Sequence, residues 1–491
     1  MKILLFICPI FLFLSCKKTV DPPQPRPNIV FIFADDMTYT AIRALGNDIV
    51  HTPNLDRLVL NGSTFTNAYN MGAWNGAVCV ASRAMLISGR SVWDARDMSE
   101  KWKTGKQLEN TWGKLMEKAG YDTYMTGKWH VDAPADSVFQ QTAHVRPGMP
   151  GDAWINSGKG GYFNWKNSDE LPIGYNRPKN ERDTAWSPSD PKFGGFWKGG
   201  QHWSEVLRDD AISFIQKAEK SENPFFMYLA FNAPHDPRQA PKEFLEKYDL
   251  KDIGVPKSFL PEYPFKDSIG TGSNLRDEAL APYPRTEYAV KVHLKEYYAA
   301  ISHVDAQIGA IVDMLKSAGK MNNTYLIFTA DHGLSVGRHG LLGKQSQYDH
   351  SIRAPFIFSG PGIPKNKKIP ADIYLQDAMA TSLQLAGMDA PDFLFFNSVL
   401  DLAKGIRTES AYDGIYGAYM TTQRMIRKNG FKLIAYPKLN KILLFDLKKD
   451  PEEQYNLAKD AQYSEHIKTL FRALLDKQQE LNDPLDLTHL M

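Results

Sequence analysis

The stretch "NIVFIFADD", Asn28–Asp36, places six apolar residues directly before two carboxylates. A short, uninterrupted apolar run rich in β-branched and aromatic residues is typical of a strand that is buried on both faces of a parallel sheet. The same pattern, in which strand-prone residues lead into a polar cluster, occurs in three further segments. These are "YDTYMTGKWH" (121–130), "PFFMYLAFNAPHD" (224–236) and "TYLIFTADHG" (324–333).

Helical patterns separate these strand-like segments. They cover residues 108–120, 206–220 and 294–319, and the last ends at Gly319, a residue suited to a helix C-terminus. Because strand and helix patterns alternate, we expect an α/β fold: a large, mixed but mostly parallel sheet sandwiched by helices.

The pattern changes near residue 390. Residues 416–457 read as short antiparallel strands, with turns at Asn429–Gly430 and near Pro437. An amphipathic helix follows at about 463–481. We therefore expect a main domain over 28–390 and a smaller C-terminal α+β subdomain over 391–491, an antiparallel sheet plus a helix.

The N-terminus is typical of an export signal. Lys2 precedes a twelve-residue, largely apolar segment, which suits a signal-peptide core and is too short to span a membrane. It ends in "FLSC", and the position of Cys16 resembles a bacterial lipoprotein signal (1–16), in which the cysteine carries the lipid anchor. Residues 17–27 form a Pro-rich tether. We expect an exported, membrane-tethered protein, periplasmic or at the cell surface; an ordinary cleaved secretion signal is the alternative.

Composition narrows the function classes. The chain is 43% hydrophobic and 23% charged, which is ordinary for a globular protein, and a net charge of +2 gives no general attraction to nucleic acid. There are three cysteines, and Cys8 and Cys16 lie in the signal segment. Cys79 is then the only thiol of the folded body, so no internal disulfide can form.

Polar side chains follow each predicted strand. The carboxyl ends of parallel strands meet at one rim of a sheet, where α/β proteins bind their ligands. The side chains expected on this rim are Asp35, Asp36, Lys128, His130, His235, Asp331 and His332.

The segment "CVASRAMLISGR" (79–90) carries a specific motif. A cysteine is followed by Ala81, Ser82 and Arg83, and then by a short run to Gly89–Arg90. With the strand-end clusters in this chain order, the sequence from Asn28 to the C-terminus resembles the formylglycine sulfatases of the alkaline phosphatase superfamily. The resemblance implies that a sulfatase-maturating enzyme oxidises Cys79 to formylglycine. One hydroxyl of the hydrated aldehyde attacks sulfur, and the other then loses its proton to expel sulfate.

The resemblance also implies a divalent metal ion. Its ligands would be Asp35, Asp36, Asp331 and His332, together with the formylglycine made from Cys79. Oxygen-rich sets suit Ca²⁺, with Mg²⁺ as the alternative. A single Asp–Asp pair at a strand end is more often a helix cap or turn, but two such clusters favour a metal. Many relatives carry Asn where this chain has His332.

Five residues receive catalytic roles from the same resemblance. Arg83 would hold the formylglycine hydrate, and Lys128 and Lys344 would bind sulfate oxygens. His235 would be the general acid for the leaving alcohol, and His130 would deprotonate the hydrate.

The substrate side is weakly marked. All ten tryptophans lie between Trp74 and Trp203, several of them in a Gly- and Pro-rich stretch. Aromatic rings there could stack on sugars or could fasten a long loop. Trp197, His202 and Arg182 are weak candidates for substrate contacts.

The expected function is removal of sulfate from a sulfated carbohydrate, of glycosaminoglycan, mucin or algal type. Two alternatives remain open: a formylglycine-dependent phosphonate or phosphodiester hydrolase, and a non-catalytic lipoprotein that binds sulfated glycans. The sequence does not specify the sugar or the sulfate position.

Overall fold

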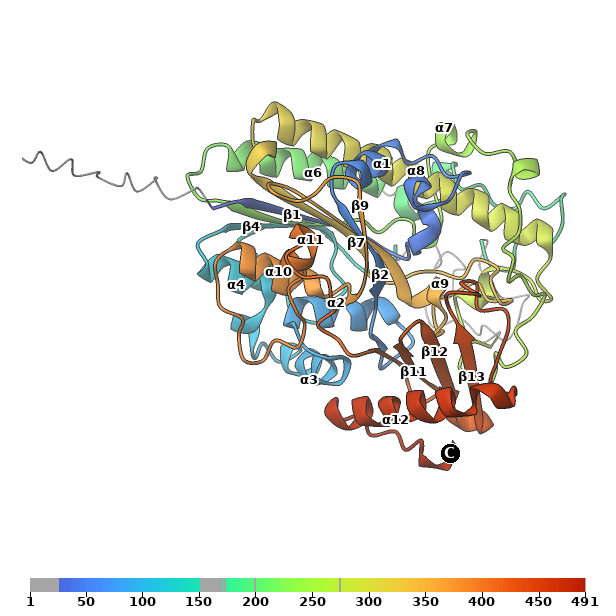
Figure 1. Cartoon of the computed structure of the whole chain (residues 1–491). Coiled ribbons are helices and arrows are strands. Elements are labelled where there is room, and N and C mark those ends of the chain that lie inside the picture. Colours follow the sequence, from blue (N-terminus) through green and yellow to red (C-terminus); the bar gives the residue numbers. More distant parts are fainter. Residues whose placement is uncertain (1–25, 151–170, 172–173, 198–199, 273–274, 491) are drawn as a thin grey trace, which may run out of the picture.

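An eight-stranded sheet forms the centre of the molecule in the computed structural model, which describes residues 26–150, 171, 174–197, 200–272 and 275–490 (Figure 1). The strand order is β5-β4-β6-β1-β7-β8-β2-β9. The bounds are β1 Asn28–Ala34, β2 Ser63–Tyr69, β4 Asp122–Lys128, β5 Gln141–Arg146, β6 Phe225–Ala230, β7 Thr324–Ala330, β8 Arg353–Ser359 and β9 Lys367–Tyr374.

The central strand is β1, the apolar run from which a buried parallel strand was predicted. Its parallel neighbours are β6 and β7, so that Phe31 is paired with Tyr228 on one side and Ile327 on the other. All seven residues of β1 are buried, and the Phe31 ring lies 4.9 Å from that of Trp112, centroid to centroid. The apolar run is therefore covered on both faces, as its composition predicts. Only β8, among these eight strands, runs antiparallel to both neighbours.

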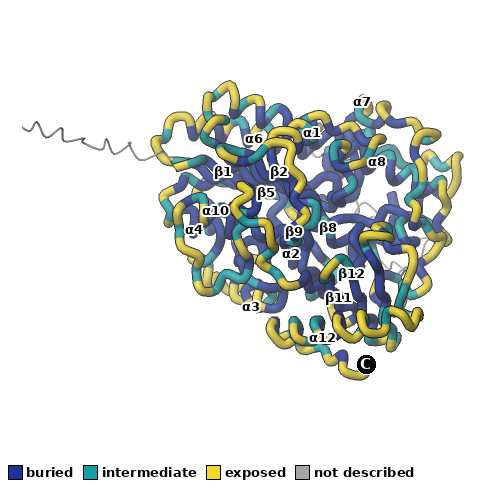
Figure 2. Tube along the Cα trace, in the orientation of Figure 1, coloured by how far each residue is buried: buried dark blue, intermediate teal, exposed yellow. Residues whose placement is uncertain are grey.

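Two layers of helices cover the sheet (Figures 1 and 2). One layer contains α1 Pro53–Leu60, α6 Trp203–Ala218 and the long α8 Glu287–Ser317; the other contains α2 Val78–Ser88, α3 Val92–Trp102, α4 Trp112–Lys118, α10 Asp377–Leu385 and α11 Leu400–Lys404. Three shorter helices complete the set: α5 Ala135–Val138, α7 Lys242–Leu245 and α9 Asp349–Ile352. Among the described residues, none of these helices combines the length and the apolar character that a membrane span requires.

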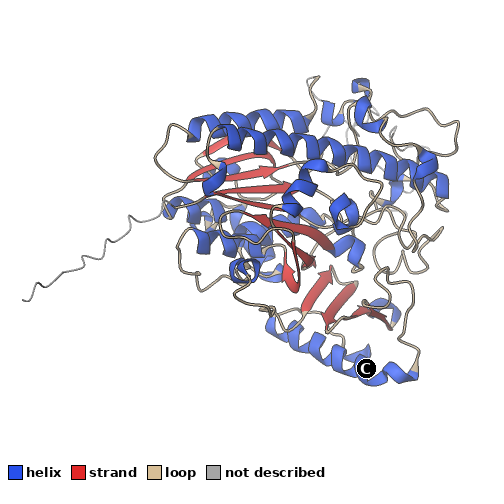
Figure 3. Cartoon of the chain, turned by 45° about the horizontal axis from the view of Figure 1, so that its top comes forward, coloured by secondary structure: helices blue, strands red, loops and turns tan. Residues whose placement is uncertain are grey.

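A smaller sheet packs beside the main body (Figure 3). Its order is β13-β12-β11-β10-β3, with β3 Gly72–Ala73, β10 Ile415–Tyr419, β11 Gln423–Lys428, β12 Phe431–Tyr436 and β13 Lys441–Asp446. Strands β10 to β13 are antiparallel, whereas β3 pairs parallel to β10. The helix α12, Ser464–Glu480, lies along this sheet. Because β3 precedes Cys79 by only six residues, the C-terminal sheet is joined directly to the cysteine segment.

The predicted fold class is confirmed: a mixed, mostly parallel sheet between helices, with an antiparallel sheet and helix near the C-terminus. The helix predicted from residue 294 begins earlier, at Glu287, because Thr286 caps it by accepting a hydrogen bond from the Ala289 N–H. Gly319 follows its end with φ of 65°. The domain boundary at 390 stays a prediction.

Gly127 allows the carboxyl end of β4 to lie close to β6. Its φ is 91°, and a Cβ there would lie 2.0 Å from the Ala230 carbonyl oxygen. We expect Gly127→Ala to lower the free energy of unfolding by at least about 2 kcal/mol, because it adds a backbone clash to the cost of the left-handed conformation. The matched control is Gly105→Ala, which has φ of 70° and no atom within 4 Å of the added Cβ. Thermal unfolding of the two variants checks this, and equal midpoints would contradict it.

Candidate active site

The four adjacent strands β4, β6, β1 and β7 deliver the polar residues to one rim of the sheet. Asp35 and Asp36 follow β1, Lys128 ends β4, and Asp331 follows β7. All four side chains are buried. His235 comes from the loop that begins after β6, and it is buried beside them. The convergence expected from the strand pattern is present.

Cys79 lies in the first turn of α2, which begins at Val78. The side chain is buried, 3% exposed, at the helix end where backbone N–H groups and the helix dipole favour negative charge. It lines a cavity of about 230 Å³ together with His130, His235 and Lys344.

Ion pairs connect the strand ends. Arg83, on α2, contacts Asp331 through Nε and Nη2 at 3.1 Å each, and its Nη1 donates to the Lys128 carbonyl oxygen at 2.9 Å. Lys128 contacts Asp35. The Lys344 Nζ donates to the two Asp36 oxygens at 2.8 and 3.1 Å.

The surroundings of Cys79 favour an anion. Burial alone would raise the pKa of the thiol, but the charges of Lys128 and Lys344 and hydrogen bonds from His130 and His235 lower it well below its usual value. Positive charge and donors therefore converge on the cavity at this position. A sulfate group held against the same atoms would receive the same stabilisation.

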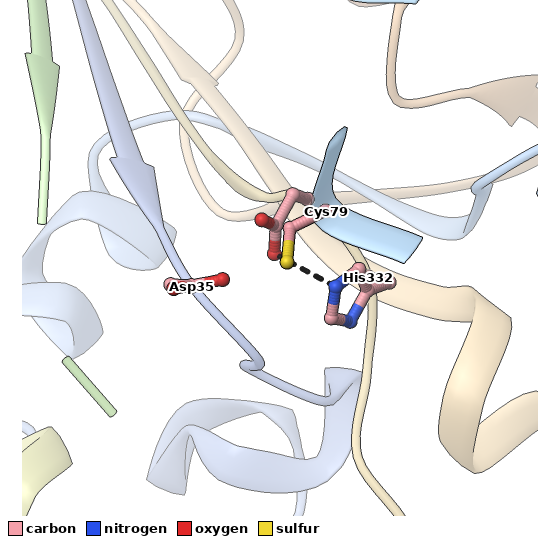
Figure 4. A group of neighbouring side chains, drawn as sticks. Asp35, Cys79 and His332 are labelled. Carbon is pink, nitrogen blue, oxygen red and sulfur yellow. Dashed lines mark ion pairs between the residues drawn. The ribbon is translucent and has the colours of Figure 1, made fainter. Parts of the chain in front are cut away.

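The carboxylates can hold a divalent cation. Burial, and then the nearby carboxylate of Asp331, raises the pKa of Asp35 well above its usual range in spite of Lys128, and a bound cation would relieve this cost of keeping the carboxylate ionised. Asp35 Oδ1 and His332 Nε2 are buried without a hydrogen-bond partner. Ligand atoms of Asp35, Cys79, Asp331 and His332 lie within 4.8 Å of one another, as do those of Asp35, Asp36 and His235. Figure 4 shows the side chains of Asp35, Cys79 and His332.

His332 fits this cation set through one ring nitrogen. Its Nδ1 lies 2.9 Å from the Gly333 carbonyl oxygen, which can only accept, so Nδ1 carries the hydrogen. The Nε2 atom then faces Asp36 and Asp331 at 3.5 Å each. The residues present fit a metal with mainly oxygen ligands and one imidazole nitrogen.

The three weak substrate candidates do not line the cavity. His202 is fully buried and caps α6: its Nδ1 accepts from the Ser204 N–H at 3.1 Å, and its Nε2 lies 3.1 Å from the Gln239 carbonyl oxygen. Trp197 packs its ring edge against His202, 5.1 Å between centroids. Arg182 is exposed in the loop after residue 177. The contact between Trp197 and His202 holds their loop against α6. Of the two roles considered for the aromatic residues, this is the fastening of a loop rather than stacking on a sugar. Cys16 lies outside the described residues.

The sequence did not mark one wall of the cavity. That wall includes Gly76, Met149, Arg276, Asp277 and Gln345. None of them follows one of the four strands predicted from the sequence or belongs to the cysteine motif, and only the place of Gln345 directly after Lys344 could have indicated it.

The comparisons agree with this geometry. Residues 27–388 match the family model described as "Sulfatase", and residues 337–480 match "N-sulphoglucosamine sulphohydrolase, C-terminal". The chain therefore belongs to the sulfatase family, and it is an enzyme that hydrolyses sulfuric esters.

Relatives cover nearly the whole chain. An arylsulfatase of Clostridium perfringens is 29% identical over 93% of this chain and 95% of its own. An N-acetylglucosamine-6-O-sulfatase of Bacteroides thetaiotaomicron is 24% identical, over 96% and 89%. Among solved structures, BT4656 in complex with its substrate D-glucosamine-2-N,6-O-disulfate is 21% identical over 94% and 99%, with a TM-score of 0.69. A phosphonate monoester hydrolase from Silicibacter pomeroyi is 18% identical over 92% and 95%, with a TM-score of 0.70.

Metal binding should raise the thermal stability of the protein. We expect millimolar Ca²⁺ to raise the thermal midpoint of the protein and a chelator to lower it, because a ligand at 100 times its Kd adds about 2.7 kcal/mol to the folded state. Asp331→Asn keeps the side-chain shape and should abolish this response. Asp377→Asn, at a buried carboxylate in α10, should keep it. A wild-type midpoint that ignores Ca²⁺, Mg²⁺ and chelator would contradict the metal site.

Proposed function

We propose that this protein removes sulfate from sulfated carbohydrates, using a formylglycine made from Cys79 and a divalent cation, Ca²⁺ or Mg²⁺. The observation that carries the proposal is the site itself. The Cys79 side chain lines a cavity with His130, His235 and Lys344. The charge of Lys128 also acts on it, and ligand atoms of Asp35, Asp331 and His332 lie within 4.8 Å of its sulfur, in a set that fits a cation.

The formylglycine hydrate would supply two hydroxyls on one carbon, one to attack sulfur and one whose deprotonation releases sulfate. The cation, held by the carboxylates and His332, would polarise a sulfate oxygen and favour the ionised hydrate. Arg83 keeps Asp331 and the end of β4 in place beside position 79. Lys128 and Lys344 offset the charge that develops on the sulfate oxygens.

Two imidazoles would move the protons. His235 is held through Nδ1, which lies 2.7 Å from the Asp236 carbonyl oxygen, so its Nε2 is the atom available to a leaving oxygen. His130 has a buried Nδ1 without a hydrogen-bond partner, and burial lowers its pKa. A neutral imidazole can accept the proton of the hydrate, the role assigned to His130.

A carbohydrate substrate is supported by the relatives. One acts on N-acetylglucosamine 6-O-sulfate by name, and one solved structure holds a glucosamine disulfate. We further propose export and a lipid anchor at Cys16, on the lipoprotein-type signal of residues 1–16. A tethered enzyme suits glycan breakdown at a cell envelope.

Cys79→Ala should lower kcat for sulfate release by about 10³-fold or more, because the nucleophile is lost. The control, Cys16→Ala, should keep the activity and release the protein from the membrane fraction. The mass of the peptide that carries Cys79, from the native host, should show formylglycine or its hydrate. An unmodified thiol in an active enzyme would overturn the mechanism.

The phosphonate or phosphodiester alternative shares the fold, as the Silicibacter structure shows. Kinetics on matched sulfate and phosphate esters separate the two. A large preference for a phosphodiester would replace the sulfatase proposal, and no hydrolysis of either ester would favour the glycan-binding alternative.

His235→Ala tests the general acid. We expect kcat for a sugar sulfate to fall by about 10²-fold or more, and kcat for 4-nitrophenyl sulfate to fall much less, because nitrophenolate leaves without protonation. Equal losses on the two esters would remove this role from His235.

A further inference from the structure

The segment Leu275–Glu278 carries part of the cavity wall that the sequence left unmarked. Leu275, Arg276 and Asp277 line the cavity beside Cys79. Arg276 contacts two carboxylates that are almost fully buried, those of Asp236 and Asp277. Its Nη2 lies 3.2 Å from Asp236 Oδ1, and its Nη1 also contacts Asp236, which makes that pair bidentate.

One end of this chain of contacts is the proposed general acid. Asp236 holds the His235 Nδ1 twice: its carbonyl oxygen lies at 2.7 Å and its carboxylate Oδ1 at 3.3 Å. Since both groups accept, Nδ1 carries the hydrogen and the ring turns Nε2 towards Asp36, 3.8 Å away. The carboxylate that orients the imidazole is therefore the one that Arg276 fixes.

The other end reaches the sulfate-binding side. Asp277 accepts a hydrogen bond from the Gln345 side-chain amide. The same amide group donates to the Gly76 carbonyl oxygen at 3.1 Å, and Gln345 Oε1 accepts from the Lys344 N–H at 2.9 Å. The chain from His235 thus ends at Lys344 and at the loop three residues before Cys79.

The adjacent residue fixes the same loop. The Glu278 carboxylate accepts from the N–H groups of Leu342, at 3.0 and 3.1 Å, and of Gly343, at 2.8 Å. Arg285 neutralises Glu278 at 2.6 Å. The segment therefore holds the loop of Lys344 by both of its carboxylates.

Arg276 is poorly placed to bind the substrate itself. Both of its terminal nitrogens already donate to buried carboxylates. Removing it would take away the one cation that contacts both Asp236 and Asp277, and losing a partner is costly for buried carboxylates. Through its two carboxylate partners, Arg276 connects the loop of Asp236 to the loop of Asp277.

We propose that Arg276 is a positioning residue: by pairing with Asp236 and Asp277 it holds His235 in register with Lys344 and Cys79 on the leaving-group side of the cavity. The inference rests on the proposed general-acid role of His235. It assigns a catalytic consequence to a side chain that need not touch the reacting atoms.

The test compares two leaving groups in three variants. Arg276→Gln should lower kcat for a sugar sulfate by about 10- to 100-fold, the effect of a misplaced catalytic group, and kcat for 4-nitrophenyl sulfate by less than about 3-fold. Arg276→Lys should restore part of the loss. The matched control is Arg424→Gln, which breaks the buried pair of Arg424 with Asp483, at 2.5 and 2.7 Å, in the C-terminal sheet. It should affect both esters equally.

The outcomes are distinct once formylglycine content is measured by mass in every variant. Equal losses on both esters in Arg276→Gln, or a change in KM alone, would overturn the inference while leaving the proposed function intact. A wild-type enzyme that hydrolyses neither ester would overturn the proposed function and the inference with it. A crystal structure of Arg276→Gln adds a readout without activity: His235 should turn away from its Asp236 contacts, and an unmoved ring would also overturn the inference.

Discussion

The structure depends on burying many charged side chains at one edge of an apolar sheet, where removing charge from water costs free energy. Four parallel strands of an apolar sheet end together, and carboxylates, lysines, an arginine and imidazoles are buried at their ends. Each pair offsets part of the cost of removing its members from water, but breaking one leaves an unpaired buried charge. The site must therefore be built as a whole. Arg83 joins the carboxyl ends of β7 and β4, Lys128 joins the end of β4 to Asp35 after β1, and Lys344 joins its loop to Asp36.

Much of this could be predicted from the sequence because strand and function share residues. A buried strand needs a continuous apolar run, and the run in β1 ends where its carboxylates begin. Parallel topology then places such ends side by side, so Asp35, Lys128 and Asp331 could be brought together before any coordinates existed. The cysteine motif supplied the chemistry, and its Cys79 and Arg83 lie on successive turns of α2.

The wall of the cavity escaped prediction for the opposite reason. Arg276, Asp277 and Gln345 lie in loops, where no periodicity links residue type to position, and their partners are distant in sequence. His202 shows the converse case: a histidine beside aromatic residues suggests a ligand contact, yet its Nδ1 caps α6 and its Nε2 contacts the Gln239 carbonyl oxygen. Local composition cannot distinguish a cap from a binding group when the deciding contact is with Gln239, 37 residues away.

The pairing of β3 with β10 has a consequence for how the protein is made. Cys79 becomes buried only when its helix packs into the finished sheet, and the neighbouring strand β3 waits for a partner about 340 residues downstream. At ribosomal speeds of about 5–20 residues per second, that delay is on the order of tens of seconds. During this interval β3, which lies just before the cysteine segment, lacks its partner strand β10. A modifying enzyme of the kind proposed above would therefore meet Cys79 before the C-terminal sheet is complete.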